Sequence, residues 1–144
     1  MESASPATSS EPVVNPVKTS AVRPVVLAVS MVVLGLTGWL GWKQWLRQRA
    51  RHDVSELAVA LNAYGIKFGR LPSGTTAEIC AMLTGQNPAH EAVVDSYELN
   101  AAGEFIDPWG TAYRLVTGPP ARAYSCGPNR TDEQGGGDDI VSGE

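Results

Sequence analysis

An uncharged apolar run near the start of the chain restricts most strongly what this protein can fold into. Residues 24–42 contain no charged side chain, and Arg23 and Lys43 close the run at its two ends. As a helix this run would extend about 28 Å, close to the roughly 30 Å of a bilayer's hydrocarbon core. Tryptophans favour the membrane interface, and three gather at its C-terminal end: Trp39, Trp42 and Trp45. We therefore expect a transmembrane helix.

A cleaved signal peptide is the competing interpretation of this run. Its apolar core would be shorter and a cleavage site between small residues would follow, whereas here the charged and bulky segment Lys43–Arg47 follows. We favour an uncleaved anchor over residues 23–46. Residues 1–22 are rich in Ser and Pro and contain no aromatic residue, which predicts a disordered tail. Residues 47–144 would form the soluble domain.

The helical pattern continues beyond the apolar run. Apolar side chains recur every three or four residues and predict one buried stripe: Val54, Leu57, Ala58, Leu61 and Tyr64. Gly65 is a typical helix stop, so we expect a single long helix to end near Tyr64. Further along, Thr75 and Glu78 have the spacing of a capping box and predict a short second helix.

The last third of the chain has the pattern of a small antiparallel sheet. The turn Asp107–Gly110 leads into a predicted strand over Thr111–Val116, and a second strand is predicted over Ala121–Cys126. We expect Trp109 and Tyr113 to be buried in the core. The soluble domain is then of the α+β class.

A Gly-rich acidic loop follows the second strand. Between Gly127 and Ser142 it holds three Asp, one Glu, one Asn and four Gly. Oxygen ligands on a sharply bent loop suit Ca²⁺. The candidate ligands are Asn129, Asp132, Asp138, Asp139 and Ser142. The alternative interpretation is a solvated acidic turn.

No arrangement of catalytic residues accompanies this loop, and we do not expect an enzyme. His52 and His90 lie far apart, and no nucleophile has a base at a typical spacing. No basic patch is interleaved with aromatic residues, so nucleic acid is not an expected partner. Cys80 and Cys126 could be two buried thiols or one disulfide, and the sequence leaves both open.

Four motifs follow one another in an order that resembles a known family. They are Tyr64 with Gly69-Arg70-x-Pro72, Asp107-Pro108-Trp109-Gly110-x-x-Tyr113, Ser125-x-Gly127-x-Asn129, and Asp138-Asp139-Ile140. Over about residues 47–142 the chain resembles the major pseudopilin of the type II secretion system. The resemblance implies a pilin-like α+β fold, with a long N-terminal membrane-spanning helix packed on a small antiparallel sheet and an acidic Gly-rich C-terminal loop. It also implies Ca²⁺ as the cofactor in that loop. Of the two adjacent carboxylates it favours Asp139, because Asp139 precedes Ile140 as in the Asp-Ile ending of that family. The resemblance further implies a structural role in protein secretion, with membrane lipid, other pseudopilin subunits and secretion-machinery proteins as partners.

The N-terminal segment departs from the pattern of that family. A prepilin carries a Gly just before its apolar segment and a Glu five residues into the mature chain. Here no Gly precedes Gly35, and the apolar run contains no acidic residue. The alternative function is therefore a single-pass, membrane-anchored binding or adaptor domain that kept the pilin fold and does not polymerise.

Two arguments about membrane orientation disagree. Lys18 and Arg23 precede the apolar run, whereas Lys43, Arg47, Arg49 and Arg51 follow it, and the count of positive charges would place the soluble domain in the cytoplasm. The calcium-type loop and the family resemblance instead favour a compartment rich in Ca²⁺. We expect a single-pass protein of the bacterial inner membrane with its soluble domain in the periplasm.

Overall fold

The computed structural model describes residues 22–95 and 97–143. Its chain divides into two compact units, residues 1–38 and residues 39–144. The predicted disordered tail lies outside the described residues, except for Val22, the first residue of helix α1 (Val22–Phe68). By length and composition α1 could cross a membrane, and none of its most apolar stretch is buried in protein. This finding agrees with the expected anchor.

Helix α1 runs past the glycine that was predicted to stop it. The prediction was wrong because Gly65 is helical, and α1 ends at Phe68. Gly69 follows with a φ of 71°, the left-handed conformation that terminates helices. A Cβ on Gly65 would lie 2.9 Å from Leu71 Cδ2. Gly65 therefore allows the returning chain to pack closely on the helix, and Gly69 ends it.

The short second helix forms as the capping pattern predicted. Helix α2 (Thr76–Leu83) begins after Thr75, whose Oγ1 accepts a hydrogen bond from the backbone N–H of Glu78. The Glu78 carboxylate accepts one from the Thr75 N–H at 2.7 Å. Ile79 and Leu83 are buried, so the capping box directs one face of α2 into the core.

Three strands form an antiparallel sheet in the order β1-β2-β3: β1 (Arg114–Val116), β2 (Arg122–Ser125) and β3 (Ile140–Val141). Leu115 pairs with Ala123, and Ser125 pairs with Ile140. The first two strands lie within the predicted ranges but are shorter. The sequence analysis missed β3, because two residues at the end of an acidic loop carry too short a pattern to recognise.

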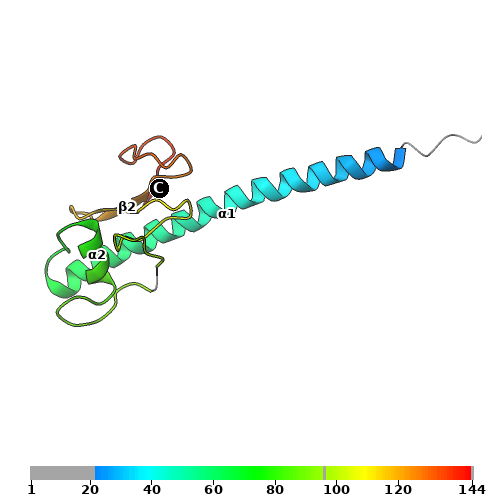
Figure 1. Cartoon of the computed structure of the whole chain (residues 1–144). Helices are drawn as coiled ribbons and strands as arrows, with labels where there is room; N and C mark the ends of the chain where they lie inside the picture. The colour runs from blue at the N-terminus through cyan, green and yellow to red at the C-terminus, as the bar shows by residue number, and fades with distance from the viewer. Residues whose placement is uncertain (1–21, 96, 144) are drawn as a thin grey trace, which may run out of the picture. The chain divides into compact units, whose positions relative to one another are not determined.

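The core lies where the second half of α1 meets the sheet. Figure 1 shows α2 and β2 beside this part of α1. Buried residues of α1 share one core with residues of α2, the loops and the sheet, among them Leu57, Leu61, Phe105, Tyr113 and Ala123. The predicted stripe on α1 is thus buried, except that Ala58 is half-buried. The α+β, pilin-like fold class is confirmed.

The aromatic part of the core differs from the prediction. Tyr113 is fully buried, as expected, but Trp109 is only half-buried and packs against the core from outside. Phe105 is fully buried in its place. Cys80 and Cys126 are both buried and not bonded to each other, so of the two alternatives the structure has two buried thiols.

Candidate functional site

The acidic loop is held at its base by buried polar groups. The Ser125 hydroxyl donates a hydrogen bond to Asp107 Oδ2 at 2.6 Å and accepts one from the Gly127 N–H at 3.0 Å. Gly127 has a φ of 66°, and a Cβ at this position would collide with the backbone carbonyl of Asp138. The beginning and the end of the loop therefore pass so close together that only glycine fits at position 127.

Asp138 and Asp139 each use one carboxylate oxygen to shape the loop. Asp138 Oδ2 accepts a hydrogen bond from the Asn129 N–H at 3.1 Å. Asp139 Oδ2 accepts two, from the N–H groups of Glu133 at 3.0 Å and Gly135 at 2.8 Å. In both residues the other oxygen, Oδ1, is buried and has no hydrogen-bond partner within the described part of the chain. Such an oxygen is costly unless a donor or a cation satisfies it.

The structure directs the other three candidate ligands to different partners. Asp132 Oδ1 accepts hydrogen bonds from the Tyr124 hydroxyl at 3.1 Å and the Gln134 N–H at 3.0 Å, and its Oδ2 lies 3.0 Å from Arg114 Nε. The Gln134 N–H, with help from Tyr124 and Arg114, lowers the pKa of Asp132 from its ordinary value. Asp132 therefore joins the loop to the exposed side of the sheet.

The remaining two candidates take part in local backbone structure. Asn129 Oδ1 accepts a hydrogen bond from the Thr131 N–H at 2.6 Å, which leaves one lone pair of the amide oxygen free. Ser142 Oγ accepts one from the Ala123 N–H at 3.1 Å. Of the five predicted ligands, the structure thus brings together Asp138 and Asp139, with Asn129 bound to Asp138 through its backbone.

Two arginines of α1 lie next to these carboxylates, and the sequence analysis did not connect them with the loop. A cavity of about 290 Å³ is lined by Arg47, Arg51, Asp138 and Asp139, together with three residues at the end of the loop. Positions 47 and 51 are four apart and share one face of a helix. This spacing was the available signal, but only the fold shows which segment that face meets.

We tested whether the loop could hold Ca²⁺. Within residues 22–95 and 97–143, no three side chains of His, Cys, Asp or Glu are grouped so as to hold a metal ion. Ca²⁺ takes six to eight oxygen ligands, and backbone carbonyls, amide oxygens and water commonly supply several of them. The two free carboxylate oxygens fit the charged part of such a site, and the amide of Asn129 with nearby carbonyls would have to complete it.

The other polar groups of the domain have structural roles. Asp107 caps its turn and accepts hydrogen bonds from the N–H groups of Trp109 at 3.0 Å and Thr111 at 2.8 Å. The Tyr113 hydroxyl donates a hydrogen bond to Asp53 Oδ2 at 2.8 Å. Burial, and then the charge of Asp53, raise the pKa of Tyr113 well above its ordinary value. It is therefore a neutral donor that joins the sheet region to α1.

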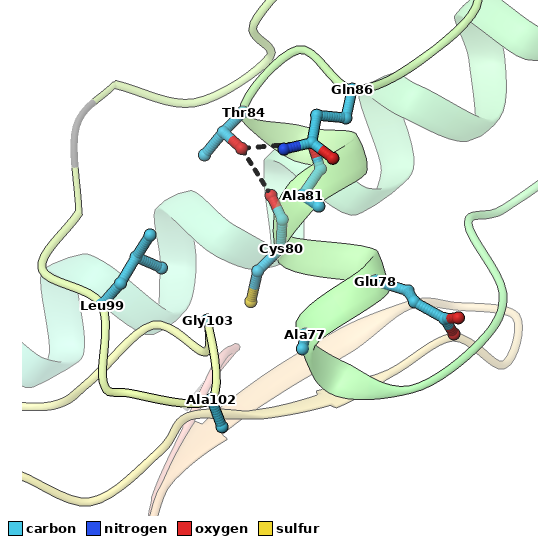
Figure 2. A pocket seen from close by; sticks show the side chains of 9 residues that line it. All are labelled: Ala77, Glu78, Cys80, Ala81, Thr84, Gln86, Leu99, Ala102 and Gly103. Atoms are coloured by element: carbon cyan, nitrogen blue, oxygen red, sulfur yellow. Dashed lines mark hydrogen bonds between the residues drawn. The ribbon is translucent and has the colours of Figure 1, made fainter.

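A further cavity, of about 330 Å³, lies between α2 and the turn near residue 102 (Figure 2). Its wall is mostly small and apolar, and Cys80 points its sulfur toward it in the view of Figure 2. Burial raises the pKa of the Cys80 thiol, and Sγ accepts a hydrogen bond from the Phe105 N–H at 3.5 Å. A neutral, buried thiol is a packing group and a poor nucleophile.

Taken together, a long N-terminal helix, a small antiparallel sheet packed on its second half and a structured C-terminal loop define a pilin-like protein. Comparison with protein families identifies the branch: the family described as type II secretion system (T2SS), protein G, matches residues 43–142, more than half of the chain. The chain belongs to this family, the major pseudopilins, which are structural subunits and not enzymes. Searches of curated proteins and of solved structures gave no significant match.

Proposed function

We propose that this chain is a pseudopilin anchored in the bacterial inner membrane, with a periplasmic domain whose C-terminal loop binds Ca²⁺. Its membership of the pseudopilin family supports a structural role alongside other components of the secretion machinery. The single observation that favours a cation in the loop is the pair of buried oxygens, Asp138 Oδ1 and Asp139 Oδ1, that have no hydrogen-bond partner among residues 22–95 and 97–143.

In this proposal Asp138 and Asp139 supply the charged ligands, and Asn129 and nearby loop carbonyls supply neutral oxygens. A bound Ca²⁺ would neutralise two adjacent carboxylates that otherwise repel each other. The hydrogen bonds to their Oδ2 atoms already fix both side chains, so little side-chain freedom remains to be lost on binding. The competing way to satisfy the two oxygens is a guanidinium group, since Arg47 and Arg51 line the same cavity.

Thermal unfolding with and without Ca²⁺ tests the proposal. Saturation at 100 times the dissociation constant stabilises a fold by about 2.7 kcal/mol, which corresponds to roughly 10–20 °C in a domain of this size. We expect a smaller shift with Mg²⁺, which demands tighter octahedral geometry. Identical melting curves in Ca²⁺ and in chelator would show that the loop is only a solvated turn.

Two variants with the same change in charge locate the effect within the loop. Asp139→Asn removes a proposed ligand, and we expect it to abolish most of the calcium-dependent shift. Asp132→Asn removes a carboxylate that binds Arg114 and Tyr124 instead, so it should leave most of that shift in place. Arg47→Gln should raise the calcium affinity. Loss of the calcium response in Arg47→Gln would argue against a cation site beside this arginine.

The proposed orientation needs an exposed label, because Cys126 is buried. Ser73 is exposed, and Ser73→Cys should react with a membrane-impermeant maleimide in cells whose outer membrane has been permeabilised. A cysteine in a cytoplasmic protein serves as the negative control. Reaction of the Ser73→Cys variant only after lysis would place the domain on the cytoplasmic side.

The second candidate function is a membrane-anchored adaptor with a pilin fold that does not polymerise. The uncharged segment from residue 24 to residue 42 favours it, because the Glu that a prepilin carries early in its mature chain has no counterpart in this segment. N-terminal sequencing of the protein extracted from membranes separates the two. An intact Met1 would exclude processing of the prepilin type and favour the adaptor.

A further inference from the structure

A cavity of about 410 Å³ lies on the second unit of the chain, where α1 leaves its uncharged stretch. Five of the residues that line it come from α1 and two from loops of the domain: Trp39, Trp42, Lys43, Leu46, Arg47, Trp109 and Pro128. Three indole rings and two cationic side chains thus surround one hollow. Neither the pilin fold nor the proposed calcium site explains this combination.

The two cationic side chains of this cavity form no ion pairs with carboxylates of the described residues. Lys43 Nζ lies 3.7 Å from the centre of the Trp39 ring, a cation–π contact that holds the ammonium group at the wall. Among the described residues no carboxylate lies within 4 Å of Lys43 or Arg47 as an ion pair. Arg47 also lines the cavity that contains Asp138 and Asp139. The charge of the hollow therefore suits an anion.

The loop side of the cavity is fixed before anything binds. The turn that carries Trp109 is held by Asp107, which is itself buried and accepts hydrogen bonds from Trp109, Thr111 and Ser125. Trp109 is half-buried rather than part of the core, so one part of its ring remains available to the cavity. A rigid indole at a fixed position gives contact area at low entropic cost.

We propose that this cavity, which we call the tryptophan–cation pocket, binds the headgroup of an anionic phospholipid. This rests on the proposed membrane anchor: if residues 24–42 span the bilayer, Trp39, Trp42 and Lys43 lie at the level of the headgroups. Indole rings favour that level, and each Lys or Arg near it attracts anionic lipid by about 1 kcal/mol. The lipid phosphate would lie between Lys43 and Arg47, and Trp109 would bring the soluble domain down onto the headgroup.

Relative lipid association measured on the full chain tests the proposal. The protein is reconstituted into phosphatidylcholine vesicles with a spin-labelled lipid, either phosphatidylglycerol or phosphatidylcholine, and electron paramagnetic resonance gives the immobilised fraction. Co-flotation with pure phosphatidylcholine vesicles is checked first. Failure to float overturns the anchor, whereas normal flotation with equal immobilisation of the two lipids overturns the pocket alone.

Two double variants with the same loss of charge separate a pocket from diffuse attraction. We expect the parent to prefer phosphatidylglycerol, and Lys43→Gln/Arg47→Gln to lower the preference by about fivefold per cation removed. Arg49→Gln/Arg51→Gln removes two charges from the same helix, and neither residue lines this pocket, so it should retain most of the preference. Equal losses in the two double variants would overturn the proposal in favour of general surface charge.

The contribution of the loop is tested by Trp109→Ala in the same assay. We expect this variant to lose part of the phosphatidylglycerol preference, although it changes no charge. Its circular dichroism spectrum shows whether the domain is folded. If the folded variant keeps the whole preference for phosphatidylglycerol, the domain does not take part in the site. If Trp109→Ala fails to fold, Pro128→Gly probes the same wall of the pocket from a different loop, and its preference is interpreted in the same way.

Discussion

Removing one buried hydroxyl group tests how the sheet region is fixed to helix α1. Tyr113 is fully buried, and its hydroxyl donates a hydrogen bond to Asp53 Oδ2 at 2.8 Å. Tyr113→Phe keeps the ring and its packing but leaves a carboxylate that is only 15% exposed without this donor. A hydrogen bond to a charged group contributes about 1.5–3 kcal/mol. Since Arg49 Nε remains 3.9 Å from the same oxygen, we expect a loss of about 2 kcal/mol.

The assay is urea unfolding of residues 43–144. This fragment lacks the whole apolar run but keeps every residue of the described core, which begins at Ala50 and ends at Ile140. In a thermal melt of the same fragment, a loss of about 2 kcal/mol would lower the melting temperature by roughly 8–16 °C. Tyr124→Phe is the matched control, because its hydroxyl bonds the exposed Asp132, and we expect it to cost well under 1 kcal/mol.

The dependence on pH gives a second readout for Tyr113. Its pKa is raised in the folded state, chiefly by burial and then by the charge of Asp53, whereas an unfolded tyrosine titrates near pH 10. A raised pKa stabilises the fold below the unfolded pKa, and this stability is lost as the pH rises above it, by about 1.4 kcal/mol per pH unit for one proton. The advantage of the parent over Tyr113→Phe should therefore shrink between pH 10 and pH 11. An equal urea midpoint at pH 8, or a difference that does not change with pH, would refute the reasoning.

Three further predictions concern the core, the second helix and the loop. In thermal melts Phe105→Ala should lower the free energy of unfolding by about 3–5 kcal/mol. Trp109→Ala should lower it clearly less, because Trp109 is half-buried, and equal losses in the two variants would contradict the assignment of the core. Thr75→Ala removes the N-cap of α2 and should lower the free energy of unfolding in urea by about 1 kcal/mol, whereas Thr75→Ser should be nearly neutral. Gly127→Ala should destabilise the fold by more than about 1 kcal/mol, since position 127 has a positive φ and lies against the carbonyl of Asp138. A stable variant that keeps its calcium response would show that the loop can widen.

The sequence alone determined the elements whose pattern is local. The uncharged run, the helical stripe on the second half of α1 and the capping box at Thr75 depend only on neighbours in the chain. Each pattern is long or specific enough to be recognised without tertiary contacts. The turn at Asp107 and the first two strands belong to the same group, because turn chemistry and alternation of period two are also local.

Tertiary structure decided the features in which distant segments meet. The sequence predicted that Gly65 stops α1, whereas the helix continues to Phe68 and Gly69 follows it in the left-handed conformation. Gly65 instead lies where a Cβ would meet Leu71. Likewise Phe105 rather than Trp109 fills the core, because burial depends on where the turn lies against the helix and the sheet.

The candidate site also combines features that the sequence predicted with features that only the tertiary structure decided. The composition of the loop favoured a cation and offered five side chains as candidate ligands. In the fold Asp132 pairs with Arg114, and Ser142 bonds to the backbone of β2. Asp138 and Asp139 line a cavity together with Arg47, and the Oδ1 atom of each has no hydrogen-bond partner among the described residues. A sequence pattern states which ligands are available. Only the packing of the loop on the sheet and on α1, across many residues of chain, decides which oxygens remain without a partner.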